Sequence, residues 1–218
     1  MSEMAIFPLM HPLLPGMFLP LNIFEPRYVQ MYAERSDANP PFGVVMIERG
    51  AEVGGGDVRS AIGCTAHIVS TGPGPAIRID VVGHTRFRID RWLPDDPYPQ
   101  AEVTPWPDDP GDGEVFWSRC GELQGRYERL GQLASRHGFE LPHLDWARPY
   151  GGDAASADAT ANYLDLATER AWKIALAAPI GALDRFNLLN TASLAPRVDA
   201  LIEVLDDQIA VLTLASPQ

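Results

Sequence analysis

The sequence of 218 residues contains a single lysine, Lys173. A nucleotide-binding P-loop needs a lysine at the end of a glycine-rich loop, because that lysine neutralises the phosphates. Lys173 lies instead in the middle of a predicted helix, and no glycine-rich loop precedes it. A Ser–Lys dyad needs an oriented lysine beside a strained nucleophile, and nothing near Lys173 has that pattern. We therefore predict a protein that is neither a P-loop ATPase nor a Ser–Lys hydrolase, with Lys173 exposed on its helix.

Cysteine is also scarce, with only Cys64 and Cys120 in the chain. Two widely spaced cysteines do not form a disulfide framework, so we expect buried thiols in a reducing compartment. No HExxH motif and no paired CxxC motif is present among the histidines and cysteines. Cys64 and His67 are three positions apart in a predicted strand, which places them on opposite faces. We therefore predict no metal site and no cofactor.

Long apolar runs and excess basic charge are missing too. No window of about 20 residues is apolar enough to span a bilayer. The first residues also lack the basic and apolar regions of a signal peptide. The formal net charge is −12, whereas nucleic acids and anionic membrane surfaces attract basic proteins. These observations predict a cytoplasmic protein that binds neither nucleic acid nor membrane.

The segment 7–32 is apolar but is cut into short pieces by prolines and by Gly16. Its only formal charges are Glu25 and Arg27, for which we expect a local ion pair. The pattern predicts two short buried strands with a turn at 14–16, followed by a helix that begins at Pro26. We interpret this segment as scaffold, with the binding surface elsewhere.

Strand patterns continue through the first half of the chain. Further strands are predicted at 42–47, 61–70, 77–89 and 100–104. Turn residues at 71–75 predict a hairpin, and a flexible loop is expected at 52–57. Gly83 within the long strand predicts a bulge or bend, which is a common device for closing a small barrel. Residues 1–105 are therefore expected to form a closed or nearly closed β unit with one helix.

The second half of the chain has helical periodicity. Prolines, glycines and aspartates at 106–113 predict an exposed linker. Apolar residues then recur at helical spacing, and we expect a helical bundle over 114–218. Helices are predicted at 114–137, at 158–178, around 183–190, and after a cap at Ser193. The fold class is therefore predicted to be α+β.

Several segments of the chain resemble the substrate-binding domain at the N-terminus of the ATP-dependent protease Lon. The string from Leu19 to Tyr28, with its Ile-Phe-Glu-Pro-Arg-Tyr ending, is the most specific of them. The other matching segments are Phe7–Leu9, Leu14–Gly16, Phe42–Val45, Gly63, Val81–Ile89, Ala178–Ile180 and Leu188–Asn190.

The resemblance implies a PUA-like β barrel followed by a helical bundle. Members of this family are fused to the Lon ATPase and protease or stand alone, and this chain is similar to the stand-alone kind. The resemblance implies a non-enzymatic module that binds unfolded or exposed apolar protein segments, with a separate protease as a further candidate partner.

Candidate residues for peptide binding are the methionines and tryptophans that suit an adaptable apolar surface. They are Met10, Met17, Trp92, Trp106 and Trp146. Alternatively, the chain is a sensory or metabolic protein that binds an anion or a small molecule in a pocket at the boundary between the two predicted domains. Arg78, Arg86 and Arg88 are the candidate anion ligands, because alternation places them on one strand face if no bulge intervenes at Gly83.

Overall fold

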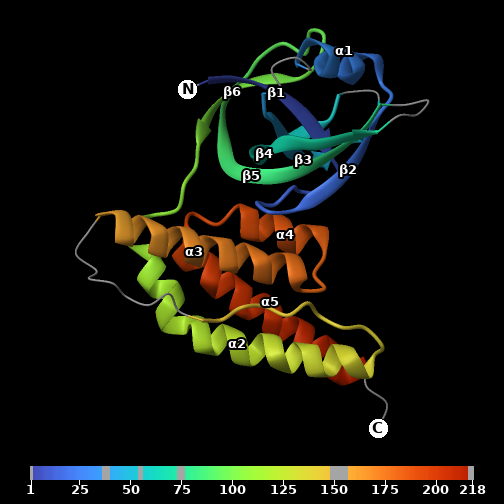
Figure 1. Ribbon diagram of the computed structural model, residues 1–218. Helices are drawn as coiled ribbons and strands as arrows, with labels where there is room; N and C mark the ends of the chain where they lie inside the picture. Colours follow the sequence, from blue (N-terminus) through green and yellow to red (C-terminus); the bar gives the residue numbers. More distant parts are fainter. Residues whose placement is uncertain (1, 36–39, 54–55, 73–76, 148–156, 216–218) are drawn as a thin grey trace. The chain divides into compact units, whose positions relative to one another are not determined.

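The structure is a computed structural model, shown in Figure 1. It describes residues 2–35, 40–53, 56–72, 77–147 and 157–215, without the side chains of 35 and 157–162. The predicted loop at 52–57 and the predicted turn at 71–75 lie partly outside these residues. The chain divides into two compact units, Met1–Pro107 and Asp108–Gln218.

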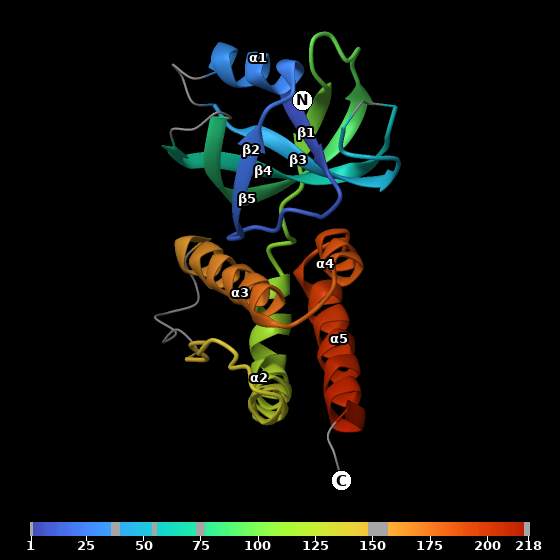
Figure 2. The same cartoon turned by 90° about the vertical axis from the view of Figure 1, so that its right-hand side faces the viewer.

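The first unit contains six strands and one helix, in agreement with the predicted β unit. The helix α1, Pro26–Arg35, lies above the strands in both views (Figures 1 and 2). The strands are β1 Ser2–Leu9, β2 Phe18–Ile23, β3 Phe42–Arg49, β4 Val58–Gly72, β5 Ile77–Trp92 and β6 Gln100–Pro105.

Five of the strands form a closed ring of pairings. The order along the sheet is β2-β5-β4-β3-β1-β6, and β6 also pairs with β5. The ring therefore runs through β5, β4, β3, β1 and β6, while β2 is attached to the N-terminal half of β5. The pairing of β1 with β3 is parallel and the other pairings are antiparallel. This arrangement agrees with the predicted small closed β unit.

The entrance to α1 is built as the sequence predicts. Pro26 is the first helical residue, where a missing N–H costs nothing. The carbonyl oxygen of Glu25 accepts hydrogen bonds from the backbone N–H groups of Tyr28 and Val29, both at 3.0 Å. The expected ion pair is present, with Arg27 Nη2 at 3.0 Å from Glu25 Oε2. These contacts fix the angle at which the chain passes from β2 into the helix.

Gly83 is required by a close approach of two segments. Its N–H donates to the Met17 carbonyl at 2.9 Å, and its own carbonyl accepts from Gly16 N–H at 2.8 Å. A Cβ atom at position 83 would lie 2.1 Å from the Leu14 carbonyl oxygen. The pairing register shifts beside this site, between Cys64 and Ala66 of β4, as expected for a bulge.

The second unit is the expected helical bundle. Its helices are α2 Asp112–Arg136, α3 Ala157–Ala177, α4 Ala182–Leu189 and α5 Leu194–Ala215. α2 packs against α3 and α5, and both α3 and α4 pack against α5. The apolar residues that recur at helical spacing in α2 are buried, and Gly138 follows the helix with a φ of 84°.

The segment 106–113, which we expected to be an exposed linker, is exposed at 107 and 109–111 but not at Asp108. The side chain of Asp108 is only 4% exposed, and its two carboxylate oxygens accept hydrogen bonds of 2.8 and 2.9 Å from Arg197. α2 already begins at Asp112, inside the predicted linker. Composition alone could not reveal this, because the partner of Asp108 lies 89 residues further along the chain.

Candidate functional site

An open groove of about 260 Å³ lies in the first unit, between the C-terminal half of β1 and the strand β2. Figure 2 shows both strands, with the segment that connects them below. Residues of the β1 wall, the β2 wall, α1 and the segment after β3 line the groove. They are Phe7, Pro8, Leu9, His11, Leu19, Pro20, Leu21, Asn22, Phe24, Glu25, Tyr28, Glu52 and Val53.

The groove exposes strand edges on both walls. The N-terminal half of β1, residues 2–5, pairs with β6, but the C-terminal half pairs only with β3 within the described chain. β2 pairs only with β5 within the same residues. Consecutive residues line each wall, 7–9 on β1 and 19–22 on β2, as expected when a groove follows the edge of a strand.

The rim of the groove carries exposed apolar side chains. Phe24 is 62% exposed and Val53 is 59% exposed, and both line the groove. Met10 follows the β1 wall and is 52% exposed, while its backbone N–H donates to Glu52 Oε1 at 2.6 Å. Large apolar side chains clustered at a groove are typical of a surface that binds a partner.

The base of the groove contains two polar atoms without partners. Tyr28 is 3% exposed, and no described residue forms a hydrogen bond with its hydroxyl oxygen. His11 Nδ1 is also buried without a partner in this part of the chain. Burial raises the pKa of Tyr28 well above its ordinary value, so the hydroxyl keeps its proton. The site therefore offers a neutral hydrogen-bond donor that nothing in the described chain uses.

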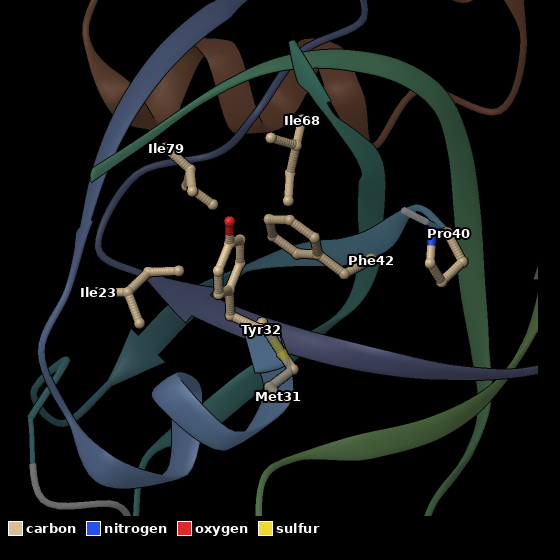
Figure 3. Close-up of a pocket in the computed structure, with 7 residues that line it drawn as sticks. All are labelled: Ile23, Met31, Tyr32, Pro40, Phe42, Ile68 and Ile79. Atoms are coloured by element: carbon tan, nitrogen blue, oxygen red, sulfur yellow. The ribbon is translucent and has the colours of Figure 1, made fainter. Parts of the chain in front are cut away.

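A second hollow, under α1, is much smaller. Figure 3 shows Met31 and Tyr32 of α1 extending toward Phe42 and Ile79. Its remaining lining residues are Ile23, Pro40 and Ile68. The hollow has a volume of about 10 Å³, which is close to the space of one water molecule. It is a packing gap and offers no room for a side chain of a ligand.

A third hollow, of about 180 Å³, lies in the helical unit. Its walls come from the segment after α2 and from α3, and they carry apolar and charged side chains together. The lining residues are Leu144, Asp145, Trp146, Leu166, Glu169, Arg170, Lys173 and Ile174. Arg170 donates to Asp145 at 3.0 Å, and Lys173 pairs with Glu169 at 2.6 Å. The charges in this hollow therefore compensate each other.

The residues expected to bind peptide belong to several different parts of the chain. Met10 lies beside the groove, whereas Met17 belongs to the turn that bonds to Gly83. Trp92 packs against the core cluster of the first unit, with the Arg59 guanidinium 5.2 Å from its ring. The remaining two candidates, Trp106 and Trp146, belong to the first and the second unit respectively.

The three arginines expected to form an anion site have different surroundings. The side chain of Arg78 is 61% exposed, whereas Arg86 is 4% exposed. The guanidinium groups of Arg86 and Arg88 lie 4.5 and 3.7 Å from the centre of the Trp106 ring. A shift in the pairing of β4 with β5 lies between Arg78 and the other two, and the anion site stays a prediction.

The described residues contain no converging set of three or more histidine, cysteine, aspartate or glutamate side chains that could hold a metal ion. Cys64 is fully buried, and burial raises the pKa of its thiol to about 12, so it is a poor nucleophile. Lys173 has a side chain that is 57% exposed, in agreement with the predicted exposed position on its helix.

None of the helices that the structure describes has the length and apolar character needed to cross a membrane.

Comparison with known proteins identifies a family. The family model of the ATP-dependent protease La (LON) substrate-binding domain matches residues 3–207. A Lon N-terminal domain protein from Xanthomonas campestris is 21% identical, with a TM-score of 0.58, over 93% of this chain and 98% of that chain. The N-terminal domain of the Mycobacterium avium complex Lon protease is 17% identical, with a TM-score of 0.60, over 94% of this chain and 99% of that chain. A search of curated protein sequences gave no match.

Proposed function

Because the chain belongs to the family of Lon substrate-binding domains, we propose that it binds unfolded or exposed apolar segments of other proteins in the groove between β1 and β2. The family indicates a protein as the ligand, and the groove offers a place for it. The proposal assigns recognition to this chain and no chemical step, with a separate protease as a further partner.

The observation that carries the proposal is the exposure of Phe24 at the groove. A phenylalanine that is 62% exposed contributes about 1–2 kcal/mol when a partner buries its remaining surface. Val53 and Met10 add apolar surface at the same rim. This surface can bind apolar segments of varied sequence, because methionine and aromatic side chains adapt to different partners.

The open form of the groove favours a peptide over an enclosed metabolite. Pockets for drug-sized ligands bury most of the surface of the ligand, whereas this groove of about 260 Å³ is open to solvent. An open groove of this size holds part of an extended chain, while the rest of that chain lies in solvent. The alternative of a small-molecule or anion-binding protein stays a prediction.

Fluorescence anisotropy with a permanently unfolded protein, such as reduced and carboxymethylated α-lactalbumin, tests the proposal. We expect the unfolded form to bind and the native form to bind far more weakly. The matched variants are Phe24→Ser and Phe139→Ser, because Phe139 is a partly exposed phenylalanine of the second unit that does not line the groove.

We expect Phe24→Ser to weaken binding about tenfold, which corresponds to about 1.4 kcal/mol, and Phe139→Ser to leave it nearly unchanged. Equal effects of the two substitutions would show that the groove is not the binding site. Absence of binding to the unfolded form would show that the function itself is wrong.

A further inference from the structure

One edge of β2 has no neighbouring strand among the described residues and is available to a bound peptide segment. Within the described residues β2 is hydrogen-bonded only to β5, and Gly83 N–H donates to the Met17 carbonyl just before the strand. In an antiparallel pair the hydrogen-bonded positions alternate, so Leu19 and Leu21, like Met17, direct their backbone groups toward β5. The backbone groups of the intervening residues therefore point to the other side, toward the groove.

These intervening residues are Phe18, Pro20 and Asn22, of which Pro20 and Asn22 line the groove. Phe18 and Asn22 each offer one N–H and one C=O, and Pro20 offers only a C=O. Proline is tolerated in a strand where its nitrogen faces away from the neighbouring strand, so Pro20 fits this assignment. The edge thus carries three acceptors and two donors at strand spacing.

The β1 wall of the groove also carries a backbone group that can accept a hydrogen bond. Ile6 N–H donates to the Pro99 carbonyl at 2.8 Å, on the side of β1 that faces β6. Alternation then places the carbonyl of Pro8 on that same side, beyond the end of the β1–β6 pairing. Pro8 lines the groove, and Tyr28 at the base has a hydroxyl without a described partner. The groove therefore combines its apolar rim with groups that can form hydrogen bonds, namely the backbone of β2, the Pro8 carbonyl and the Tyr28 hydroxyl.

We propose that the bound segment is an extended chain that adds a strand to the free edge of β2. This inference rests on the proposed function and specifies the ligand as an apolar segment able to adopt a β conformation, rather than an amphipathic helix. Main-chain hydrogen bonds to Phe18, Pro20 and Asn22 supply sequence-independent affinity, and the apolar rim selects the side chains. A hydroxyl donor at Tyr28 gives the segment a further polar contact.

The charge of the protein also favours a segment with basic flanks. Of the two glutamates that line the groove, Glu25 is paired with Arg27, so Glu52 is the carboxylate left to attract a basic group, and the chain as a whole carries a net charge of −12. Lysine or arginine beside the apolar part of the ligand complements this charge.

N-methylated peptides test the inference on the unaltered protein. The probe is a fluorescein-labelled peptide of eight valine, isoleucine and leucine residues with a lysine at each end. Two derivatives carry N-methyl groups at alternate residues, one on the even and one on the odd positions. Because only one edge of the peptide meets β2, we expect one derivative to bind at least about tenfold more weakly than the other.

A pair of protein variants gives an independent measurement. Asn22→Pro removes a groove-facing N–H, whereas Asn22→Ala removes only the side chain. We expect Asn22→Pro to weaken binding of the probe about fivefold and Asn22→Ala to change it less than twofold. Melting temperatures of both variants establish that they are folded.

The outcomes separate the inference from the proposed function. If the unmethylated probe binds and both derivatives bind equally well, the ligand does not add a strand to β2, although the groove still binds apolar segments. If neither the probe nor unfolded proteins bind, both the proposed function and the added strand are wrong.

Discussion

The rings of Phe7 and Tyr28 pack with their centroids 4.2 Å apart, so that β1 and α1 meet at the base of the groove. The Arg27 guanidinium lies 4.5 Å from the centre of the Tyr28 ring. The ring of Tyr28 is thus held firmly, while its hydroxyl has no partner among the described residues. Packing explains the position of the ring, whereas the hydroxyl has no structural use among the described residues.

Replacing Tyr28 with phenylalanine separates these two roles. A buried hydroxyl without a partner costs free energy, so we expect Tyr28→Phe to leave the free energy of unfolding unchanged or to raise it by about 1 kcal/mol. We expect the same variant to bind an unfolded protein a few-fold more weakly. Urea denaturation and anisotropy measure the two effects. A loss of stability of more than about 1 kcal/mol would show that the hydroxyl is used within the folded chain.

The ion pair of Asp108 and Arg197 is the main polar contact in the core of the helical unit. The side chain of Arg197 is fully buried, and its guanidinium also lies 3.9 Å from the centre of the Trp172 ring. Removing one partner leaves an uncompensated buried charge, so we expect Asp108→Asn to destabilise the helical unit by about 3–5 kcal/mol.

Chemical denaturation followed by the fluorescence of Trp172 and the other tryptophans measures this loss. The control is Lys173→Ala, which breaks the exposed i,i+4 pair with Glu169 and should change stability by less than about 0.5 kcal/mol. Similar losses in both variants would contradict a special role for the buried pair.

The secondary structure of this chain could be predicted because its signals are local. Pro26 marks the start of α1, Gly83 marks the bend in β5, and the apolar spacing in α2 marks its buried face. The groove could not be predicted, because it depends on where β1 separates from β6. The burial of Arg86 depends on the exact register of β4 and β5. These are long-range pairings that a periodic pattern does not encode.

All of the groove residues except Glu52 and Val53 belong to the segment 7–32 that we interpreted as scaffold only. The sequence pattern indicates which residues of β2 alternate inward, but not that its outer edge has no neighbour among the described residues. The exposure of Phe24 just after that strand also has no signal in the sequence, because an aromatic residue at the end of a strand is usually buried.

Acid should weaken the first unit through Asp57. Burial alone raises the pKa of this carboxyl, but hydrogen bonds from the Arg59 side chain, 2.6 Å away, and from the backbone outweigh it, and the pKa lies below the ordinary 3.8. A lowered pKa stabilises the folded state at neutral pH, and this stabilisation is lost as the pH falls below about 4.

We expect the stability difference between the wild type and Asp57→Asn to shrink as the pH is lowered from 5 to about 2.5. Urea midpoints across this range measure the difference. Asp95→Asn is the comparison, because Asp95 also pairs with Arg59 but has a side chain that is 41% exposed, and its effect should be smaller. A difference between wild type and Asp57→Asn that stays constant with pH would contradict the assignment.

Charge beside the apolar part of a ligand should change affinity in a salt-dependent way. The net charge of −12 attracts basic flanks and repels acidic ones. We expect an apolar peptide with terminal lysines to bind more tightly than the same peptide with terminal glutamates at low salt. The two affinities should converge above about 0.5 M salt, where screening is strong. Anisotropy titrations at several salt concentrations measure this, and a preference for glutamate flanks would contradict the charge argument.

The most direct test of the central claim is residue-resolved amide hydrogen exchange by NMR, with and without the lysine-flanked apolar peptide. The account predicts slower exchange at Phe18 and Asn22, whose N–H groups face the groove, and little change at Leu19 and Leu21, which already bond to β5. Slowed exchange confined to other parts of the chain, such as the segment around Trp146, would contradict binding in the groove between β1 and β2.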